Sequence, residues 1–260
     1  MSTKMPLIFI GHGSPMNAIE ENIYTDSWKA IGKSISERPR AILMFSAHWI
    51  TEWDTRISAT EKPEMIYDMY GFPEELYDVR YSALGSSSIA REITQELAGE
   101  YDIIWDTIHG LDHGVWSTLI HLFPDANIPL IQMSLDYSRS PEWHYTFGKK
   151  LRNLRDQGIL IIWSGNIVHN LRAIDWSGNE QYTWAIEFDS RISKAIEEGN
   201  YADIVDFQNW WDITRLAQPS HDHLLPLILL LGAVSEDDRV EFWTPDIVMG
   251  SLSMRSIVWI

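Results

Sequence analysis

The sequence contains no cysteine in its 260 residues. This absence excludes disulfide bonds, thiolate zinc sites, iron–sulfur clusters and a cysteine nucleophile. Positive charge is also scarce, because 20 Lys and Arg stand against 37 Asp and Glu, and the formal net charge is −17. Such a charge repels phosphate backbones and anionic lipid surfaces, so we expect no nucleic-acid or membrane partner. Any metal that this protein binds must be held by His, Asp, Glu or water.

Long apolar runs are absent as well. The most apolar stretch, residues 224–234, is interrupted by Pro226, whereas a membrane-spanning helix needs about 20 apolar residues. The N-terminal segment has a short apolar stretch without the small-residue cleavage site of a secretory signal. The sequence therefore predicts a cytoplasmic protein.

The order of apolar and amphipathic segments predicts one α/β domain over residues 1–260. Short, nearly continuous apolar runs alternate with longer amphipathic segments, which is typical of a mostly parallel central sheet flanked by helices. A small extra strand at residues 55–59 is expected at one edge. We predict the main strands at residues 7–10, 41–45, 102–105, 129–133, 160–163 and 256–260, and helices at residues 25–36, 87–97, 115–122, 141–157, 183–197 and 223–231.

Histidines follow three of the predicted strands. His12, His48 and His169 come shortly after the first, second and fifth strand, and each is preceded by small residues. In open α/β sheets, ligands bind beyond the carboxyl ends of the strands. Because neutral imidazole is the commonest side-chain metal ligand, these positions predict a metal site.

Two further histidines are candidates for this site. His223 opens a predicted helix, and His113 stands beside Asp112. No His-Glu-x-x-His and no Gly-x-Ser-x-Gly motif occurs, which excludes two common hydrolase signatures. We expect the other four histidines at the surface, within helices or as a solvated helix cap: His109, His121, His144 and His221.

Each candidate also has a structural alternative. His12 could serve as a loop residue between two glycines, and His48 as a buried, hydrogen-bonded core histidine. His169 and His223 could cap helices, and His113 could pack as a structural group. These alternatives stay open on the residues alone.

Six blocks of sequence, in this order along the chain, resemble a known family. The resemblance is to the 4,5-DOPA extradiol dioxygenases, a group of class III extradiol ring-cleavage dioxygenases related to the catalytic subunit of protocatechuate 4,5-dioxygenase. It runs from about residue 6 to residue 256, and the set of blocks is far more specific than any one alone. The blocks are residues 11–17 (GHGSPMN), 46–49 (SAHW), 112–116 (DHGVW), 164–170 (SGNIVHN), 223–227 (HLLPL) and 249–254 (MGSLSM).

The resemblance implies a non-haem Fe(II) enzyme that opens the ring of a catechol such as L-DOPA with O₂, giving a yellow seco-DOPA semialdehyde. By position in the matching blocks, His12 and His48 are metal ligands, His223 is the third ligand and His169 lies at the metal as a fourth histidine. His113 matches a pocket histidine that acts on the substrate or on the oxygen intermediate. Related bacterial proteins hold zinc, so Zn(II) is the alternative occupant.

One departure from the more distant class III enzymes concerns His223, which stands where those enzymes have a ligating Glu. An all-histidine site is less anionic than a two-His-one-carboxylate triad. This leaves the metal open between Fe and Zn. It also leaves two roles open for His169, which is either a ligand or the acid–base group that takes the second catechol proton.

Two alternatives use the same histidines. One is a zinc hydrolase, because Zn²⁺ lowers the pKa of bound water to about 7. The other is a non-catalytic protein that holds a metal without an open coordination position. Oxygen dependence separates the dioxygenase from the hydrolase.

The apolar C-terminal strand fits a sheet edge or a subunit interface equally, which leaves the oligomeric state open. Candidates for contacts with the substrate are the aromatic residues Trp49, Tyr70, Phe72, Trp116 and Trp176, and Arg172 for a carboxylate.

Overall fold

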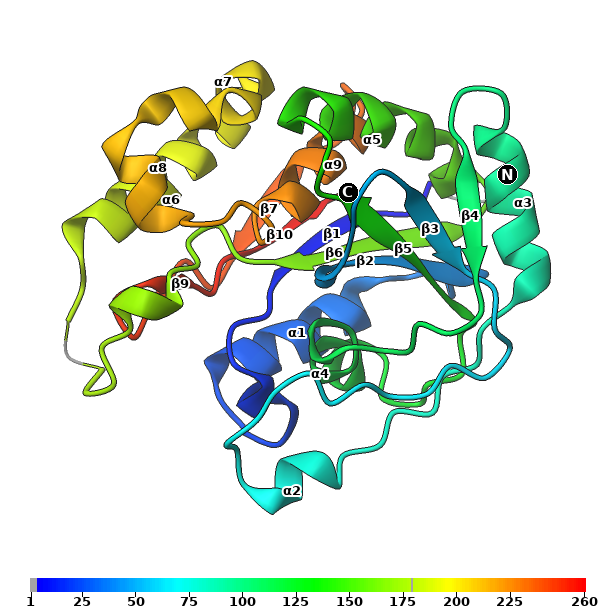
Figure 1. Ribbon diagram of the computed structural model, residues 1–260, viewed down its shortest axis with the longest axis horizontal. Helices are drawn as coiled ribbons and strands as arrows, with labels where there is room; N and C mark the ends of the chain where they lie inside the picture. The colour runs from blue at the N-terminus through cyan, green and yellow to red at the C-terminus, as the bar shows by residue number, and fades with distance from the viewer. Residues whose placement is uncertain (1–3, 179) are drawn as a thin grey trace.

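The computed structural model describes residues 4–178 and 180–260. It shows a twisted central sheet with helices on both faces (Figure 1). Within these residues, eight strands join in the order β4-β3-β5-β2-β6-β1-β10-β7, and β8 pairs with β9 in a small second sheet. The strands are β1 (Leu7–Gly11), β2 (Ala41–Thr51), β3 (Thr55–Ser58), β4 (Ile103–Asp106), β5 (Leu130–Asp136), β6 (Ile159–Gly165), β7 (Val240–Trp243), β8 (Ile247–Val248), β9 (Leu252–Ser253) and β10 (Ser256–Trp259).

The middle of the sheet is parallel. β1 pairs with β6, β6 with β2 and β2 with β5, all in parallel. β10 runs antiparallel to β1 and to β7, and β3 runs antiparallel to β5. The expected mostly parallel α/β sheet is therefore confirmed, with antiparallel strands added toward both edges.

Alternating side chains of the central strands enter two separate cores. Leu7 and Phe9 of β1 face one core, and Ile8 and Ile10 face the other. Helices α3, α5, α6, α7 and α9 contribute to the first core, while α1, α2 and α4 contribute to the second, and Figure 1 shows α5 and α9 on the opposite side of the sheet from α1 and α4. The helices are α1 (Ile23–Ser34), α2 (Glu74–Tyr77), α3 (Ser87–Leu97), α4 (His113–Leu122), α5 (Pro141–Asp156), α6 (Thr183–Glu197), α7 (Tyr201–Val205), α8 (Asp212–Ala217) and α9 (Leu225–Ala233), with short 3-10 helices η1 (Pro15–Ala18), η2 (Leu171–Ala173) and η3 (Phe207–Trp210).

The closest helix contact joins α5 to α9 through two glycines. A Cβ atom on Gly148 would lie 1.9 Å from the carbonyl oxygen of Leu229, and one on Gly232 would lie 2.0 Å from that of Tyr145. Only hydrogen fits at these two positions, so the backbones of the two helices touch. This contact fixes α9, and with it the residues that immediately precede α9.

Several sequence predictions need correction. The extra strand β3 does lie toward one edge of the sheet, but it is not the outermost strand, because β4 pairs beyond it. The C-terminal strand β10 is neither an edge nor free for an interface, because it pairs with both β1 and β7. Helix α4 begins at His113, two residues before its expected start, and α9 begins two residues after His223. None of the helices in the described part of the chain has the length and apolarity needed to cross a lipid bilayer.

Candidate metal centre

His12 directly follows β1 and is 1% exposed. Its ring nitrogen Nδ1 shares a hydrogen bond of 2.9 Å with the hydroxyl of Ser164 at the end of β6. The backbone N–H of His12 also donates to the carbonyl oxygen of Gly165, at 3.2 Å. The neighbouring strand therefore fixes both the backbone and the ring of His12, and leaves Nε2 for the centre of the site.

His48 lies inside β2, in contrast to the expectation that it follows the strand. β2 continues to Thr51, but its register with β5 shifts between Phe45 and Ile50. This irregularity surrounds His48, whose Nε2 lies 3.2 Å from Nε2 of His12. Two imidazole nitrogens directed at each other over such a short distance fit two ligands of a single metal ion.

His113 is the first residue of α4 and is held by Asp68, a residue that belongs to none of the six sequence blocks. Its backbone N–H donates to Oδ1 of Asp68, and its Nδ1 shares a hydrogen bond with Oδ2, both at 2.9 Å. Oδ2 also lies 3.5 Å from Nδ1 of His48. Burial raises the pKa of the Asp68 carboxyl, but the hydrogen bond and charge of His113 lower it more, so that pKa lies below its ordinary value. Asp68 is therefore a carboxylate that orients two histidines.

The sequence neighbour of His113 has a different role. Asp112 accepts a hydrogen bond of 2.7 Å from the hydroxyl of Ser46, and that hydroxyl in turn accepts the backbone N–H of His48 at 3.2 Å. A Cβ atom on Gly114 would lie 2.7 Å from the same hydroxyl. The first turn of α4 thus packs directly on the strand segment that carries His48.

His223 and His169 complete the cluster from the other side. Their rings stack with centroids 3.4 Å apart and planes at 5°. Nδ1 of His223 shares a hydrogen bond of 3.0 Å with Asp222. Among the described residues, the buried Nε2 of His223 has no hydrogen-bond partner, which is the state expected of a ring nitrogen whose partner is a metal ion.

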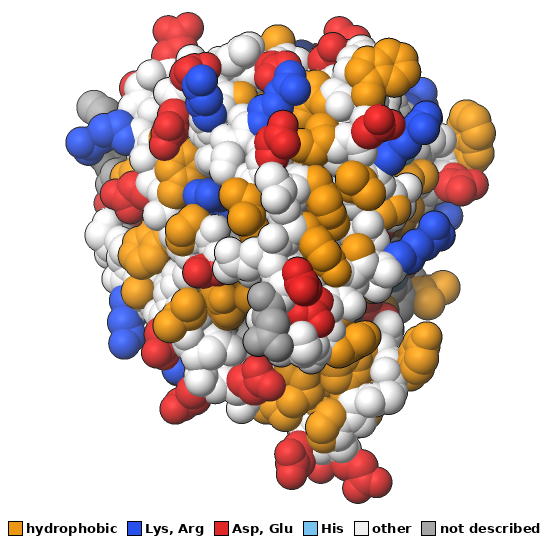
Figure 2. Space-filling model, turned by 90° about the vertical axis from the view of Figure 1, so that its left-hand side faces the viewer, with side chains coloured by type: hydrophobic (Ala, Val, Ile, Leu, Met, Phe, Trp, Pro, Cys, Tyr) orange, Lys and Arg blue, Asp and Glu red, His pale blue; other side chains and the backbone are white. Residues whose placement is uncertain are grey.

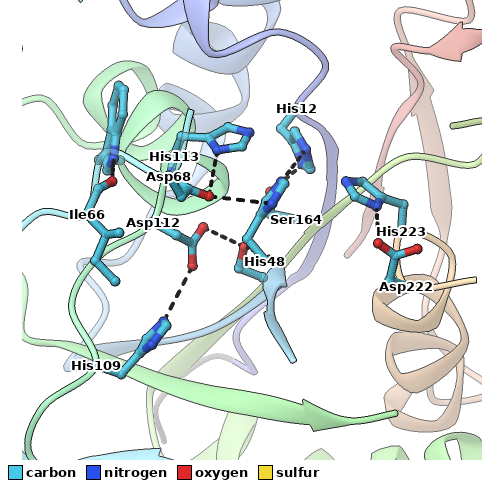
Figure 3. Close-up of polar contacts among 12 residues, drawn as sticks. His12, His48, Ile66, Asp68, His109, Asp112, His113, Ser164, Asp222 and His223 are labelled. Carbon is cyan, nitrogen blue, oxygen red and sulfur yellow. Dashed lines mark hydrogen bonds and ion pairs between the residues drawn. The ribbon is translucent and has the colours of Figure 1, made fainter. Parts of the chain in front are cut away.

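The rings of His12, His48, His113 and His223 lie around one space, with Asp68 and Asp222 at its sides (Figure 3). From the ring centroid of His12, those of His48, His113 and His223 lie 5.1, 5.6 and 5.3 Å away. Ligand atoms of His12, His48 and His113 all lie within 4.8 Å of one another. The donor set and the unpartnered nitrogen of His223 together fit a metal ion.

Burial and mutual repulsion keep the imidazoles of His12, His48 and His169 neutral. Burial lowers the pKa of His12 well below its ordinary value of 6.5, and the neighbouring histidines lower it further. The pKa values of His48 and His169 are lowered for the same reasons. Burial raises the pKa of Asp222, but the hydrogen bond to His223 lowers it more, so the carboxylate stays charged. Neutral imidazole beside a charged carboxylate is the form that binds metals.

A cavity of about 740 Å³ opens onto the cluster and is lined by all five histidines. Of the aromatic residues considered for substrate contact, Tyr70, Phe72 and Trp176 line it. Trp49 and Trp116 do not belong to its lining. Trp49 stacks on His109 at 4.2 Å, and buried Trp116 donates to a backbone carbonyl at 3.0 Å.

The other histidines lie outside the cluster. His109 stacks on Trp49, His121 is in the last turn of α4, and His221 stacks on Tyr137. His144 is in a helix as expected, but it is fully buried in α5.

The family model of the catalytic LigB subunit of aromatic ring-opening dioxygenase matches residues 6–256. The chain belongs to this family. It is therefore an aromatic ring-opening dioxygenase, and neither the hydrolase nor the non-catalytic alternative is favoured. The histidine cluster is the feature of this LigB-family protein that suits a metal-dependent reaction.

Relatives of this LigB-family chain match it over nearly its whole length. A protein of Escherichia coli (strain K12) named 4,5-DOPA dioxygenase extradiol is 41% identical over 259 residues, which cover 98% of this chain and 95% of that protein. A protein of the same name from Beta vulgaris is 35% identical over 239 residues, covering 90% and 88%. The crystal structure of an uncharacterized E. coli K12 protein matches with a TM-score of 0.82 and 36% identity, covering 98% of this chain and 99% of that one.

Proposed function

We propose that this dioxygenase cleaves the ring of a catechol such as L-DOPA in the 4,5-extradiol position, using Fe(II) and O₂. The observation that carries this proposal is that His12, His48 and His223 line one cavity with ring centroids 5.0 to 5.3 Å apart. The buried Nε2 of His223 has no hydrogen-bond partner among the described residues. Relatives named 4,5-DOPA dioxygenase extradiol support the choice of substrate. Both oxygen atoms of O₂ enter the ring-opened product, a yellow seco-DOPA semialdehyde.

His12, His48 and His223 would hold the metal, with His169 stacked against His223 as a fourth histidine at the site. A bound Fe(II) supplies Lewis acidity toward the two catechol oxygens and a redox-active centre for O₂. Zn(II) fits the same nitrogen donors but lacks redox chemistry.

His113 acts on protons in this proposal. Its Nδ1 is engaged by Asp68, so Nε2 is the nitrogen left to accept a proton from a catechol hydroxyl and to return it later. The carboxylate of Asp68 stabilises the imidazolium that forms, as the acid member of a catalytic triad does. His169 lines the same cavity and is the second group placed to take a catechol proton.

The direct test mixes Fe(II)-loaded protein with L-DOPA in air and without oxygen, and follows the yellow product by visible absorbance. We expect colour in air only. Absence of turnover with a panel of catechols, by protein whose iron content is verified, would reject the proposal.

Variants separate metal binding from proton transfer. His12→Ala, His48→Ala and His223→Ala should lose both the metal and turnover, whereas His113→Ala should keep the metal and lose turnover. His121→Gln is the matched control, because His121 lies at the far end of α4 from His113. Metal loss in the His113 variant would instead make His113 a ligand.

A further inference from the structure

The wall of the cavity beside the histidines includes one positively charged side chain among the described residues. Among the described residues that line it, Arg172 is the only Lys or Arg. The other charged groups in its wall are Asp68 and Asp222, and both are hydrogen-bonded to histidines of the cluster. The cavity therefore has negative carboxylates at the histidine cluster and a positive guanidinium elsewhere on its wall.

The backbone of Arg172 is held in place by Asn170. The side-chain oxygen of Asn170 accepts the backbone N–H of Arg172 at 3.0 Å, and its amide donates to the carbonyl of Leu216 at 2.8 Å. The hydroxyl of Ser251 donates to the carbonyl of Asn170 at 2.9 Å. Asn170 is 7% exposed, so a buried side chain holds the backbone of Arg172, while the Arg172 side chain itself is exposed.

The guanidinium of Arg172 has no carboxylate partner among the residues of 4–178 and 180–260. About half of the arginines in this chain have no carboxylate partner among these residues, so what distinguishes Arg172 is its place in the wall of the cavity. Other arginines of this chain do pair with carboxylates: Arg40, Arg56, Arg139, Arg155, Arg191 and Arg255. Arg172 is thus a cation left available to a ligand.

A second hollow adjoins the first at the same residue. It measures about 480 Å³, is lined by both Arg172 and Arg215, and shares Pro219 with the main cavity. Large apolar side chains are exposed close to these two arginines in the sequence. Leu171 and Trp176, near Arg172, are 60% and 83% exposed, and Trp211, near Arg215, is 72% exposed. Figure 2 shows the side of the molecule that carries α6 to α8, where apolar side chains gather between acidic ones. A ligand tail that reaches Arg172 would therefore meet apolar contacts as well as positive charge.

We propose that Arg172 is the anion subsite of the catechol cavity and selects catechols whose side chain ends in a carboxylate. This inference rests on the proposed function. The planar guanidinium pairs with a carboxylate through two parallel hydrogen bonds. The carboxylates at the cluster repel the acid end of such a substrate, so the diol enters first and the acid stays at Arg172.

The test compares Arg172→Gln and Arg172→Lys with wild type on two acids, L-DOPA and dihydrocaffeate, and on two catechols without a carboxylate, dopamine and methylcatechol. Loss of a charged hydrogen-bonding pair predicts an increase in KM of about 10- to 100-fold for the acids. The KM for dopamine and methylcatechol and the kcat for all four should change little, and Arg172→Lys should recover part of the loss. Arg38→Gln removes an equal charge before β2, at the opposite end of the sheet, and should have no effect.

A binding measurement without turnover keeps the two proposals separate. Phenylpropanoate, an acid without the diol, should bind wild type and lose about 10-fold or more in affinity to Arg172→Gln by calorimetry. Equal effects of Arg172→Gln on acids and on dopamine, or unchanged phenylpropanoate binding, would overturn the anion subsite. If iron-loaded wild type cleaves none of the four catechols, the proposed function fails, and the phenylpropanoate arm still decides the role of Arg172.

Discussion

At the scale of single residues, one carboxylate organises two histidines of the metal centre. Asp68 holds His113 by its backbone and by its ring, and lies 3.5 Å from Nδ1 of His48. Outer carboxylates of this kind set the orientation and basicity of imidazoles around metals. The activity of His113 should therefore depend on the charge of Asp68 and not only on its shape.

Replacing Asp68 by Asn tests this dependence. Asn keeps the size of the side chain and one hydrogen-bond acceptor but removes the charge that stabilises a protonated His113. We expect kcat to fall by roughly 10- to 100-fold, with the metal content, measured by atomic emission, close to that of wild type. Asp125→Asn, an exposed change outside the cavity, is the control. A kcat for Asp68→Asn equal to that of wild type would show that His113 works without its carboxylate.

At the scale of elements, the contact between α5 and α9 has no space for another atom. Gly148→Ala would place a Cβ atom 1.9 Å from a carbonyl oxygen of α9, so the helices must separate. We expect the free energy of unfolding to fall by about 1–3 kcal/mol, the usual cost of overpacking a tight core. Urea denaturation of the variant and of wild type measures this change in the free energy of unfolding. Lys149→Ala, at the next and exposed position of α5, should change stability by less than about 0.5 kcal/mol. Equal midpoints for the two variants would contradict the tight contact.

Helix α5 also carries a buried titrating group. Burial lowers the pKa of His144 from 6.5 to about 4, so below pH 6.5 the unfolded chain binds a proton that the folded chain does not. The free energy of unfolding should therefore decrease as the pH falls from 6.5 to about 4, by roughly 1.4 kcal/mol per pH unit from this group. In the His144→Gln variant, the free energy of unfolding, measured by urea denaturation between pH 6.5 and about 4, should decrease less steeply with falling pH, by the contribution of this one group. Parallel pH dependence of variant and wild type would assign the effect to other groups.

At the scale of the whole molecule, the net charge of −17 acts on substrates before they reach the cavity. Long-range repulsion slows the approach of anions and speeds that of cations, and added salt screens both effects. We expect sodium chloride to raise kcat/KM for dihydrocaffeate and to lower it for dopamine, each by a few-fold, with little change for zwitterionic L-DOPA. Steady-state rates over a salt series measure this. The same response for all three substrates would exclude steering by the net charge.

The sequence predicts the centre of this molecule better than its margins. The central strands are apolar runs that are buried on both faces, and a short continuous apolar run predicts such a strand directly from the sequence. These strands are β1, β2, β5 and β6. The place of β3 is not readable, because the order of strands depends on pairings between distant segments. β7 escapes prediction because its residues are partly exposed and include a charged glutamate.

The metal centre, too, has some residues that the sequence predicts and others that it does not. His12 and His169 are predictable, since parallel strands end at one edge of the sheet and bring their following loops together. Asp68 is not, because it comes from a loop without periodicity and reaches His113 across 45 positions. The only local sign of its importance is the surrounding group of aromatic residues, Tyr67, Tyr70 and Phe72.

The position of β10 next to β1 has a consequence for biosynthesis. Of the described strands, β1 is made first, yet its two neighbours are β6, which begins at Ile159, and β10, which ends at Trp259. Both edges of the strand that leads to His12 stay open until these later strands are made, and unpaired strands are prone to pair with other chains. We therefore expect the edge of β1 that faces β10 to stay unpaired in the nascent chain until β10 is made.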